Sequence, residues 1–543
     1  MLRASPLFFR SIVRRLPLFT LLAVLSLSFL TFGYLAYLEF GPFAAVELQV
    51  DELYFYSCAA RHSITGLWLN PGCHDNKPPL IYLIHQFVQP HSYLYNVWVG
   101  KLAAFGVMLL MVGGVAQLAL RLAERAAAVA SVVLLIAALA PNAQFWALKT
   151  ESIGLLLVLA AFGLMAVPRP VAHGKCLGAG LLLGLAVLVK QTNVIFLGLS
   201  CVWLLWMGRA HWRQTLGRTA CVALAGSVPF IGYLAGVSWE GQAESFLASF
   251  LVYPSVYAGG VSRGFHAYVM RFANVYELVT TGRELLVALF VLGMLQTLYR
   301  RLVCKEPAAS LAGRWLVLSA AFCTFAAAMA APTFWAYHAI PIWVFMSILA
   351  GVAFGDLWTD LKRARPPQAV MLGIVLGVSA FTGLLQVWHH NAGRGDPPVG
   401  ISRPPSIEGA SGQYAYVLGP SWPSFYTDNG LIPASNILFS WALPGMPKFE
   451  LYTPPSPEST KGQRLAQIQA KNLEQLWKDF AGTPPRYLGL VTGVTSAPGS
   501  DRLVDVPGFD EYLRAHCRYF KTMTMERADH TPRPLVVYRC NGG

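Results

Sequence analysis

Long apolar segments alternate with short polar ones over most of this chain, and the pattern predicts a bundle of helices that crosses a membrane. Eleven apolar spans are predicted: Leu16 to Leu38, Val97 to Leu120, Ala126 to Ala140, Ile153 to Val167, Cys176 to Val189, Val194 to Met207, Thr219 to Val237, Leu285 to Leu298, Trp315 to Ala331, Ala339 to Phe354, and Ala369 to Trp388. Several are shorter than the ~20 residues that a full crossing needs, so flanking residues must extend them or the helices must be tilted or broken. Residues 1–390 are therefore expected to form an α-helical polytopic membrane domain.

The pattern changes after the last span, where Pro397-Pro398 and Pro404-Pro405 mark a linker into a polar region. Three apolar runs there are typical of buried strands: Tyr414 to Gly419, Tyr487 to Val491, and Leu535 to Tyr538. An apolar stripe predicts a helix that begins near Ser459, through Leu465, Ile468, Leu473, Leu476, Trp477 and Phe480. Alternating strands and helices predict a small soluble α/β domain over residues 391–543.

Two loops, 51–96 and 238–284, are too long and too aromatic to be simple connectors. In the first, the apolar positions from Tyr54 to Ala59 and from Ile81 to Phe87 predict two short amphipathic helices in the membrane interface. In the second, Arg263, Arg271 and Arg283 interleave with aromatic residues, which is typical of a segment at the headgroup level. Such a segment either anchors the protein in the interface or covers a lateral entrance for lipid.

The composition excludes a soluble globular protein, because 55% of the residues are hydrophobic and only 13% are charged, whereas soluble domains have roughly 25% charged residues. The net charge of +14 does not indicate a nucleic-acid partner, since within the membrane region eighteen Lys and Arg residues fall on one side of the predicted bundle and only eight on the other. This bias places the amino terminus in the cytoplasm, and it places loop 51–96, Glu151 and the terminal domain outside. The assignment requires that Cys176 to Met207 split into two spans at Lys190-Gln191-Thr192-Asn193.

Cysteine positions agree with this orientation, because Cys58, Cys73, Cys517 and Cys540 all fall on the predicted outer side. Two disulfides are permitted there if the compartment is oxidising, and the alternative is free thiols that only pack. The first span is longer than the apolar core of a signal peptide and has no small-residue cleavage site after it. We interpret it as a membrane anchor.

Charged motifs lie at the predicted outer ends of the spans, where burying or half-burying a charge costs several kcal/mol unless it has a partner or a function. They are Asp51-Glu52, Lys77-Pro78-Pro79-Leu80, Lys149-Thr150-Glu151, Gly184-Leu185-Ala186-Val187-Leu188-Val189-Lys190-Gln191-Thr192, and Tyr337-His338-Ala339-Ile340-Pro341. In this order, across the first 350 residues or so, the set resembles the GT-C glycosyltransferases that use lipid-phosphate sugar donors, such as protein O-mannosyltransferases and aminoarabinose transferases. Each motif alone is a weak signal.

The resemblance implies a role for each charged residue. Asp51 is expected to be the catalytic base, with Glu52 and Tyr54 positioning the substrate. Glu151 is expected to be a second catalytic residue, which shares the cavity with Asp51 and contributes to positioning the acceptor or the sugar. Lys77, Lys190 and His338 are expected to bind the donor phosphate, and Tyr337 is expected to position the sugar. The departure from the family is Lys149, which would neutralise Glu151 if the two formed an ion pair.

Structural alternatives exist for each of these residues. Asp51 and Glu52 would also cap an interfacial helix, Lys77 would also snorkel to the interface, and Lys190 would also pair with Glu151 or a helix end. A lone interfacial histidine such as His338 is more often structural. His62, His74, His85 and His91 fit no standard zinc spacing, so a divalent cation has no ligand motif to support it.

An inverting transfer from a polyprenyl phosphate needs one carboxylate to take the acceptor's proton while the phosphate leaves from the opposite face of the sugar. The sequence therefore predicts a transferase that moves a sugar from undecaprenyl or dolichyl phosphate to a lipid, glycan or protein acceptor at the outer face, without a further cofactor or nucleic acid. The paired outer cysteines favour a bacterial inner membrane with a periplasmic active site. Two alternatives are a transporter or flippase of polyprenyl-linked substrates, although no internal repeat is evident, and an inactive scaffold.

Overall fold

The computed structural model describes residues 54–59, 61, 77–88, 97–139, 148–166, 171–247, 250–251, 265–280, 283–330 and 336–364 of the membrane region, and residues 407–418, 425–426, 429–435, 437, 443–444, 456, 458–491, 506–526 and 532–541 of the terminal region. Asp51, Glu52 and Cys73 lie outside the described residues, as do the first and last predicted spans, Leu16 to Leu38 and Ala369 to Trp388.

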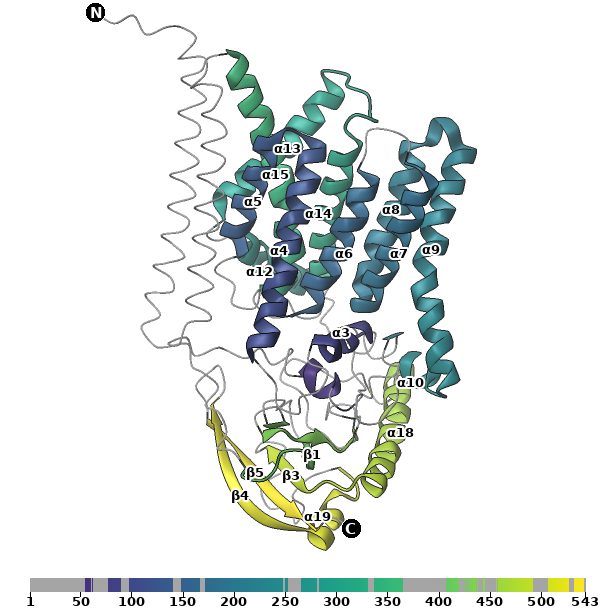
Figure 1. Cartoon of the computed structure of the whole chain (residues 1–543), viewed down its shortest axis with the longest axis vertical. Helices are drawn as coiled ribbons and strands as arrows, with labels where there is room; N and C mark the ends of the chain where they lie inside the picture. Colours follow the sequence, from purple (N-terminus) through teal and green to yellow (C-terminus); the bar gives the residue numbers. More distant parts are fainter. Residues whose placement is uncertain are drawn as a thin grey trace, which may run out of the picture.

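Apolar helices form a bundle over the described membrane region, with the helix axes roughly side by side (Figure 1). Five of these helices are long and apolar enough to cross a membrane, and the others are shorter apolar helices. Their bounds are α4 Val97–Leu122, α5 Arg125–Leu139, α6 Thr150–Met165, α7 His173–Val189, α8 Val194–Met207, α9 Trp212–Trp239, α13 Glu284–Leu302, α14 Ala312–Ala330 and α15 Ile340–Ala364. Each matches one predicted span, and the prediction of a polytopic helical membrane protein is confirmed.

The chain reverses direction between α7 and α8, at the position where the sequence predicts that one long apolar segment splits into two spans. Helix α7 ends at Val189, and a short 3₁₀ helix, η2 Gln191–Asn193, precedes α8. In the second half of α8, the indole of Trp203 donates a hydrogen bond to the carbonyl of Ala312, at 2.9 Å. The adjacent Gly313 faces Leu122, at the end of α4. Helix α8 therefore returns to the end of the bundle where α4 finishes, and the predicted split is correct.

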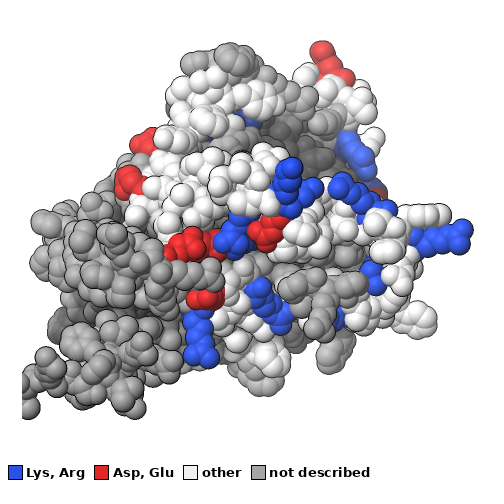
Figure 2. Space-filling view, turned by 90° about the horizontal axis from the view of Figure 1, so that it is seen from above, with Lys and Arg blue, Asp and Glu red and all other residues white. Residues whose placement is uncertain are grey.

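The end of the bundle that lies away from the terminal domain is rich in basic side chains, and Figure 2 looks onto it. Arg314 donates to both carboxylate oxygens of Asp356, at 2.6 and 3.0 Å, and Arg300 lies 3.1 Å from the same carboxylate. This cluster joins α13, α14 and α15. Other basic residues at the helix ends on this side are Arg121, Arg125, Lys175, Arg209, Arg213, Arg218 and Arg301.

Shorter helices occupy the two long loops. Residues 54–59 are helical, and α3 Leu80–Val88 follows Lys77. The second loop contains α10 Ala243–Leu247 and α12 Phe265–Thr280. Tyr268, Phe272 and Tyr276 recur at every fourth position of α12 and are each about half exposed, so they form one aromatic stripe on that helix.

The terminal domain is a five-stranded sheet with helices packed on it, in the order β2-β1-β3-β5-β4. Strand β1 is parallel to β2 and β3, and β5 is antiparallel to β3 and β4. The elements are β1 Tyr414–Leu418, β2 Ile432–Pro433, α18 Thr460–Gly482, β3 Tyr487–Val491, α19 Phe509–His516, β4 Cys517–Glu526 and β5 Pro532–Cys540. The hydroxyl of Ser459 caps α18 by accepting from the Gly462 N–H at 3.0 Å, so the predicted α/β fold and helix start are both confirmed.

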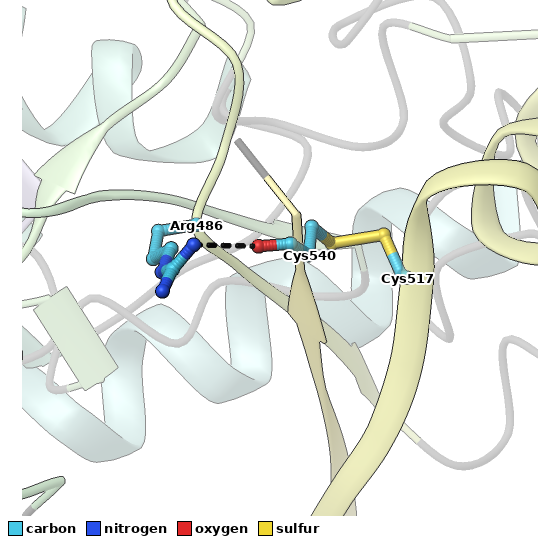
Figure 3. The surroundings of a disulfide bond; sticks show 3 residues. All are labelled: Arg486, Cys517 and Cys540. Atoms are coloured by element: carbon cyan, nitrogen blue, oxygen red, sulfur yellow. Dashed lines mark hydrogen bonds between the residues drawn. A yellow bond between two sulfur atoms is a disulfide. The ribbon is translucent and has the colours of Figure 1, made fainter. Parts of the chain in front are cut away.

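A disulfide joins Cys517, at the start of β4, to Cys540, at the end of β5 (Figure 3). Arg486, just before β3, donates a hydrogen bond to the carbonyl of Cys540 at 3.4 Å. The disulfide and the hydrogen bond together link the edge strand β4, through the end of β5, to the residue that precedes the central strand β3. Cys58 is also disulfide-bonded, and Cys73, its predicted partner, lies outside the described residues.

The terminal domain contacts one end of the bundle, beneath α3 and α10 (Figure 1). One continuous apolar cluster includes Phe55 of the first loop, Tyr82 of α3 and Ala104 of α4, together with Ala415 and Leu476 of the terminal domain. The described part of loop 51–96 thus lies between the helix bundle and the sheet.

Candidate functional site

Four chemically distinctive side chains from distant parts of the sequence converge at the end of the bundle that faces the terminal domain. Glu151 lies in the first turn of α6, and Lys190 is the residue at which α7 ends. His338 lies on η5 Ala336–Ala339, just before α15, and Lys77 lies three residues before α3. They meet because the helices alternate in direction, so the start of α6 and α15 and the end of α7 fall at the same end.

Glu151 and Lys190 form a direct ion pair. The Glu151 side chain is only 2% exposed, and Lys190 Nζ donates a hydrogen bond to its Oε1. The hydroxyl of Thr150 donates to the other oxygen, Oε2, at 2.8 Å. Both carboxylate oxygens therefore have a donor, which is what a buried charge requires.

The turn after α7 fixes the position of Lys190. Its backbone N–H donates to the carbonyl of Ala186 at 2.9 Å, and the side-chain amide of Asn193 donates to that same carbonyl at 2.9 Å. The 3₁₀ turn then directs the chain back into α8. The ammonium group of Lys190 is held at the mouth of the bundle, with its side chain 18% exposed.

His338 lies beside this pair, with its Nε2 3.9 Å from Glu151 Oε1. Burial, and after it the positive charge of Lys190, lower the pKa of His338 to about 3, although the negative charge of Glu151 opposes both effects. The ring is neutral at pH 7, so its contact with Glu151 is not an ion pair. A neutral imidazole retains one donor and one acceptor nitrogen for a ligand.

Lys77 also acts electrostatically on this cluster, because its positive charge is felt by both Glu151 and His338. With Lys77 and Lys190 protonated and Glu151 ionised, the three groups carry a net charge of +1. The first turn of α6 adds the positive end of a helix dipole. This arrangement favours binding of an anionic group such as a phosphate.

The remaining predicted residues are placed differently. Asp51 and Glu52 lie outside the described residues, and so does the side chain of Tyr337. Tyr54 is buried in the apolar cluster beneath the terminal domain, with its ring centroid 6.3 Å from that of Phe55. The predicted absence of a zinc motif concerned four histidines of the first long loop, and the structure describes one of them, His85. Its Nε2 donates a hydrogen bond to the carbonyl of Leu148 at 3.1 Å. Within the described ranges, no three His, Cys, Asp or Glu side chains group closely enough to hold a metal ion.

Sequence reasoning did not single out two further buried charges near this end. Lys101, in α4, is 1% exposed, and Arg61, after the first helical segment, is 4% exposed. A lysine inside an apolar span is itself a signal of function or pairing, so the sequence contained evidence for Lys101. Arg61 lies in an ordinary loop sequence, and only the structure reveals its burial.

No protein-family model matches the sequence, and no curated protein does. Solved structures do share the fold. The crystal structure of ArnT from Cupriavidus metallidurans bound to undecaprenyl phosphate has a TM-score of 0.54 and 13% identity, covering 95% of this chain and 97% of ArnT. The same protein in the apo state gives a TM-score of 0.53 and 14% identity, covering 95% of this chain and 98% of ArnT.

A second solved structure with this fold is the archaeal oligosaccharyltransferase AglB from Archaeoglobus fulgidus, in complex with an inhibitory peptide and a dolichol-phosphate. It has a TM-score of 0.50 and 12% identity, covering 87% of this chain and 69% of AglB. The chain described here is an integral membrane protein that shares its fold with ArnT and with AglB.

Proposed function

We propose that this protein is an inverting glycosyltransferase that moves a sugar from a polyprenyl-phosphate carrier to an acceptor at the outer face of the membrane. The observation that carries the proposal is the convergence of Lys77, Glu151, Lys190 and His338 at one end of a GT-C fold, beside the loop that begins at Asp51. The ligands in the solved structures of this fold, undecaprenyl phosphate and dolichol-phosphate, support a donor of the same chemical class.

In the proposed reaction, Asp51 accepts the proton of the acceptor hydroxyl or amine as that group attacks the anomeric carbon. The new glycosidic bond forms while the bond from the anomeric carbon to the phosphate oxygen breaks. The electron pair of that bond goes to the carrier phosphate, which leaves with an additional negative charge. Lys77 and Lys190 stabilise this charge, and the neutral His338 donates a hydrogen bond to a phosphate or sugar oxygen.

Glu151 acts in this scheme mainly through Lys190. Its two carboxylate oxygens are already engaged by Lys190 and Thr150, which leaves it poorly suited to take a proton from the acceptor. The carboxylate instead fixes the ammonium group where the donor phosphate would bind, and it keeps the local charge low enough for the phosphate to dissociate after transfer. Lys190 is thus the phosphate ligand, and Glu151 is its positioning residue.

Two observations support the proposed side of the membrane: the disulfides and the basic end of the bundle. The Cys517–Cys540 disulfide belongs to an oxidising compartment, and the Lys and Arg residues at the opposite end favour the cytoplasm. The site would therefore face the periplasm if the membrane is a bacterial inner membrane. The aromatic stripe of α12, a helix that contacts η5, would flank the route by which the lipid carrier enters.

The proposal is tested in a deletion strain complemented with wild type, with Asp51→Asn, or with Asp360→Asn. Asp360 lies on an exposed position near the end of α15, at the basic end of the bundle, and serves as a carboxylate control. Mass spectrometry of surface glycans, lipids and proteins should show one sugar missing in the deletion strain and with Asp51→Asn, and restored by the other two. Restoration of that sugar by Asp51→Asn would remove Asp51 as the base.

The same strains separate the transferase from a flippase. A transferase predicts that the lipid-linked donor accumulates on the outer face when Asp51 is replaced, because delivery continues and transfer stops. If the donor accumulates on the cytoplasmic face instead, the protein moves lipid-linked sugars across the membrane and the proposed function is wrong.

A further inference from the structure

Arg61 connects the first outer loop to the terminal domain through a set of buried polar contacts. Its side chain is 5% exposed, and one guanidinium nitrogen lies 3.6 Å from Oδ2 of Asp479 in α18, whose side chain is 9% exposed. The other terminal nitrogen donates a hydrogen bond to the carbonyl of Pro433, the last residue of β2. A single side chain from the membrane region thus contacts both a strand and a helix of the terminal domain.

Two other side chains of the terminal domain hold the Asp479 carboxylate in place. The hydroxyl of Ser435 donates to Asp479 Oδ2 at 2.7 Å, and the amide of Gln475 donates to Oδ1 at 2.7 Å. These bonds fix the carboxylate at the surface where Arg61 docks. A buried carboxylate held in this way favours a fully desolvated arginine with a defined orientation.

A packed path leads from Arg61 toward the candidate site. The helical segment 54–59 precedes Arg61, and its Phe55 ring lies 5.7 Å from Tyr82 and 5.5 Å from His85 of α3, measured between ring centroids. His85 in turn donates to the carbonyl of Leu148, three residues before Glu151. The same helical segment follows Asp51 in the sequence after two intervening residues.

We propose that Arg61 is a positioning residue, through which the terminal domain holds the first outer loop in the geometry that sugar transfer requires. The inference rests on the proposed function, and it assigns the terminal domain a part in catalysis beyond stabilising the fold. The domain holds residues 54–59 and α3 in place, the segments that follow Asp51 and Lys77 in the sequence, while the Glu151–Lys190 pair is built by the helix bundle alone.

The test uses the full-length protein in lipid nanodiscs as wild type, Arg61→Met, Arg61→Lys and Arg464→Met. Arg464 is exposed on α18 and receives the matched substitution away from the contact. Arg61→Met removes the charge, yet Asp479 keeps its bonds from Ser435 and Gln475, so the terminal domain should remain folded. Arg61→Lys keeps the charge but not the fork that reaches two acceptors, and it should restore part of the loss.

In Arg61→Met, amide hydrogen exchange should increase in residues 54–59 and in α3, with no increase in α6 or α7. The turnover number kcat should fall by about 10²-fold, because a misplacement on the order of 1 Å at a catalytic group has that effect. The KM for the lipid-linked donor should rise by less than kcat falls, since Lys190 is held independently of the loosened loop and only Lys77 belongs to it. If Arg61 only stabilised the fold, Arg61→Met would instead change the amount of folded protein, and kcat would not fall by more than KM changes.

The results distinguish this inference from the proposed function. If wild type transfers sugar while Arg61→Met and Arg464→Met behave alike in exchange and in kcat, the positioning role is wrong and the transferase stands. If no variant transfers sugar but Arg61→Met loosens residues 54–59 and α3, the domain contact is real and the proposed function is wrong.

Discussion

The ion pair between Glu151 and Lys190 is the residue-scale feature on which the candidate site depends. Both residues could be named from the sequence, because charges at the ends of apolar spans are costly without a partner or a function. Their pairing could not be decided in advance, since Lys149 and Lys190 were both plausible partners. The choice depends on how the turn after α7 places Lys190 against the first turn of α6, which is a tertiary contact.

Removing Lys190 should harm the fold more than removing both charges. Lys190→Met leaves the Glu151 carboxylate buried without its counter-ion, which costs roughly 3–5 kcal/mol. Adding Glu151→Gln removes that charge while an amide can still accept from Thr150. We expect thermal unfolding in detergent to show a large loss for Lys190→Met and a smaller one for the double variant.

Sugar transfer should stay low in both variants, because the double variant recovers the fold but not the phosphate ligand. A double variant as unstable as the sum of the two single variants would show that the two side chains do not depend on each other.

His338 should contribute a pH-dependent stability. Its pKa in the folded protein is lowered to about 3, whereas an unfolded histidine has a pKa of about 6.5. Between these values the unfolded state binds the extra proton, so stability should fall as the pH is lowered through this window, by up to about 1.4 kcal/mol per pH unit.

Thermal unfolding of wild type and His338→Asn between pH 4 and pH 7 measures this effect. The variant should lose less stability on acidification than wild type does. If the two curves are parallel over the whole range, the His338 ring is protonated in the folded protein as readily as in the unfolded one.

At the scale of elements, hydrophobic periodicity predicts the apolar helices well because burial in lipid and burial in a bundle both favour the same residues. Strands β1, β3 and β5 and helix α18 were also predictable from apolar runs and a Ser cap. Strands β2 and β4 were not. Strand β2 has two residues, and β4 is an edge strand whose Tyr519 and Phe520 are exposed, so neither has the buried run that marks a central strand.

The close packing of α7 against α9 explains why glycine stands at position 184. A Cβ at Gly184 would lie 2.2 Å from the backbone oxygen of Gly226 in α9, so α7 and α9 approach each other too closely for a side chain there. We expect Gly184→Ala to separate these helices and to lower thermal stability markedly. Because Lys190 follows on the same helix, sugar transfer should fall as well.

The matched control is Gly198→Ala in α8, where a Cβ would meet no atom within 4 Å. Alanine is the better helix former by about 1 kcal/mol, so this variant should be as stable as wild type or slightly more so. Equal melting temperatures for Gly184→Ala and Gly198→Ala would contradict the close α7–α9 contact.

At the scale of the whole molecule, the sequence indicates two regions but not how they dock. The contact is formed by an arginine in a loop, a strand end and one face of α18, and no periodic pattern links these three. The apolar cluster shared by the first loop, α3, α4 and the sheet places the terminal domain directly over the end of the bundle that contains the candidate site. The disulfide of this domain and the basic residues at the opposite end of the bundle support the orientation proposed above.

The most direct test of the account is binding of polyprenyl phosphate to the purified protein, measured by native mass spectrometry for wild type, Lys77→Gln and Lys175→Gln. Lys175 is exposed near the start of α7, at the opposite end of the bundle, and provides the matched control. We expect wild type and Lys175→Gln to bind undecaprenyl phosphate alike, and Lys77→Gln to bind it at least 10-fold more weakly because a charge-assisted contact to phosphate is lost. Equal binding by all three proteins, or no binding by wild type, would contradict a donor-phosphate site at this end of the bundle.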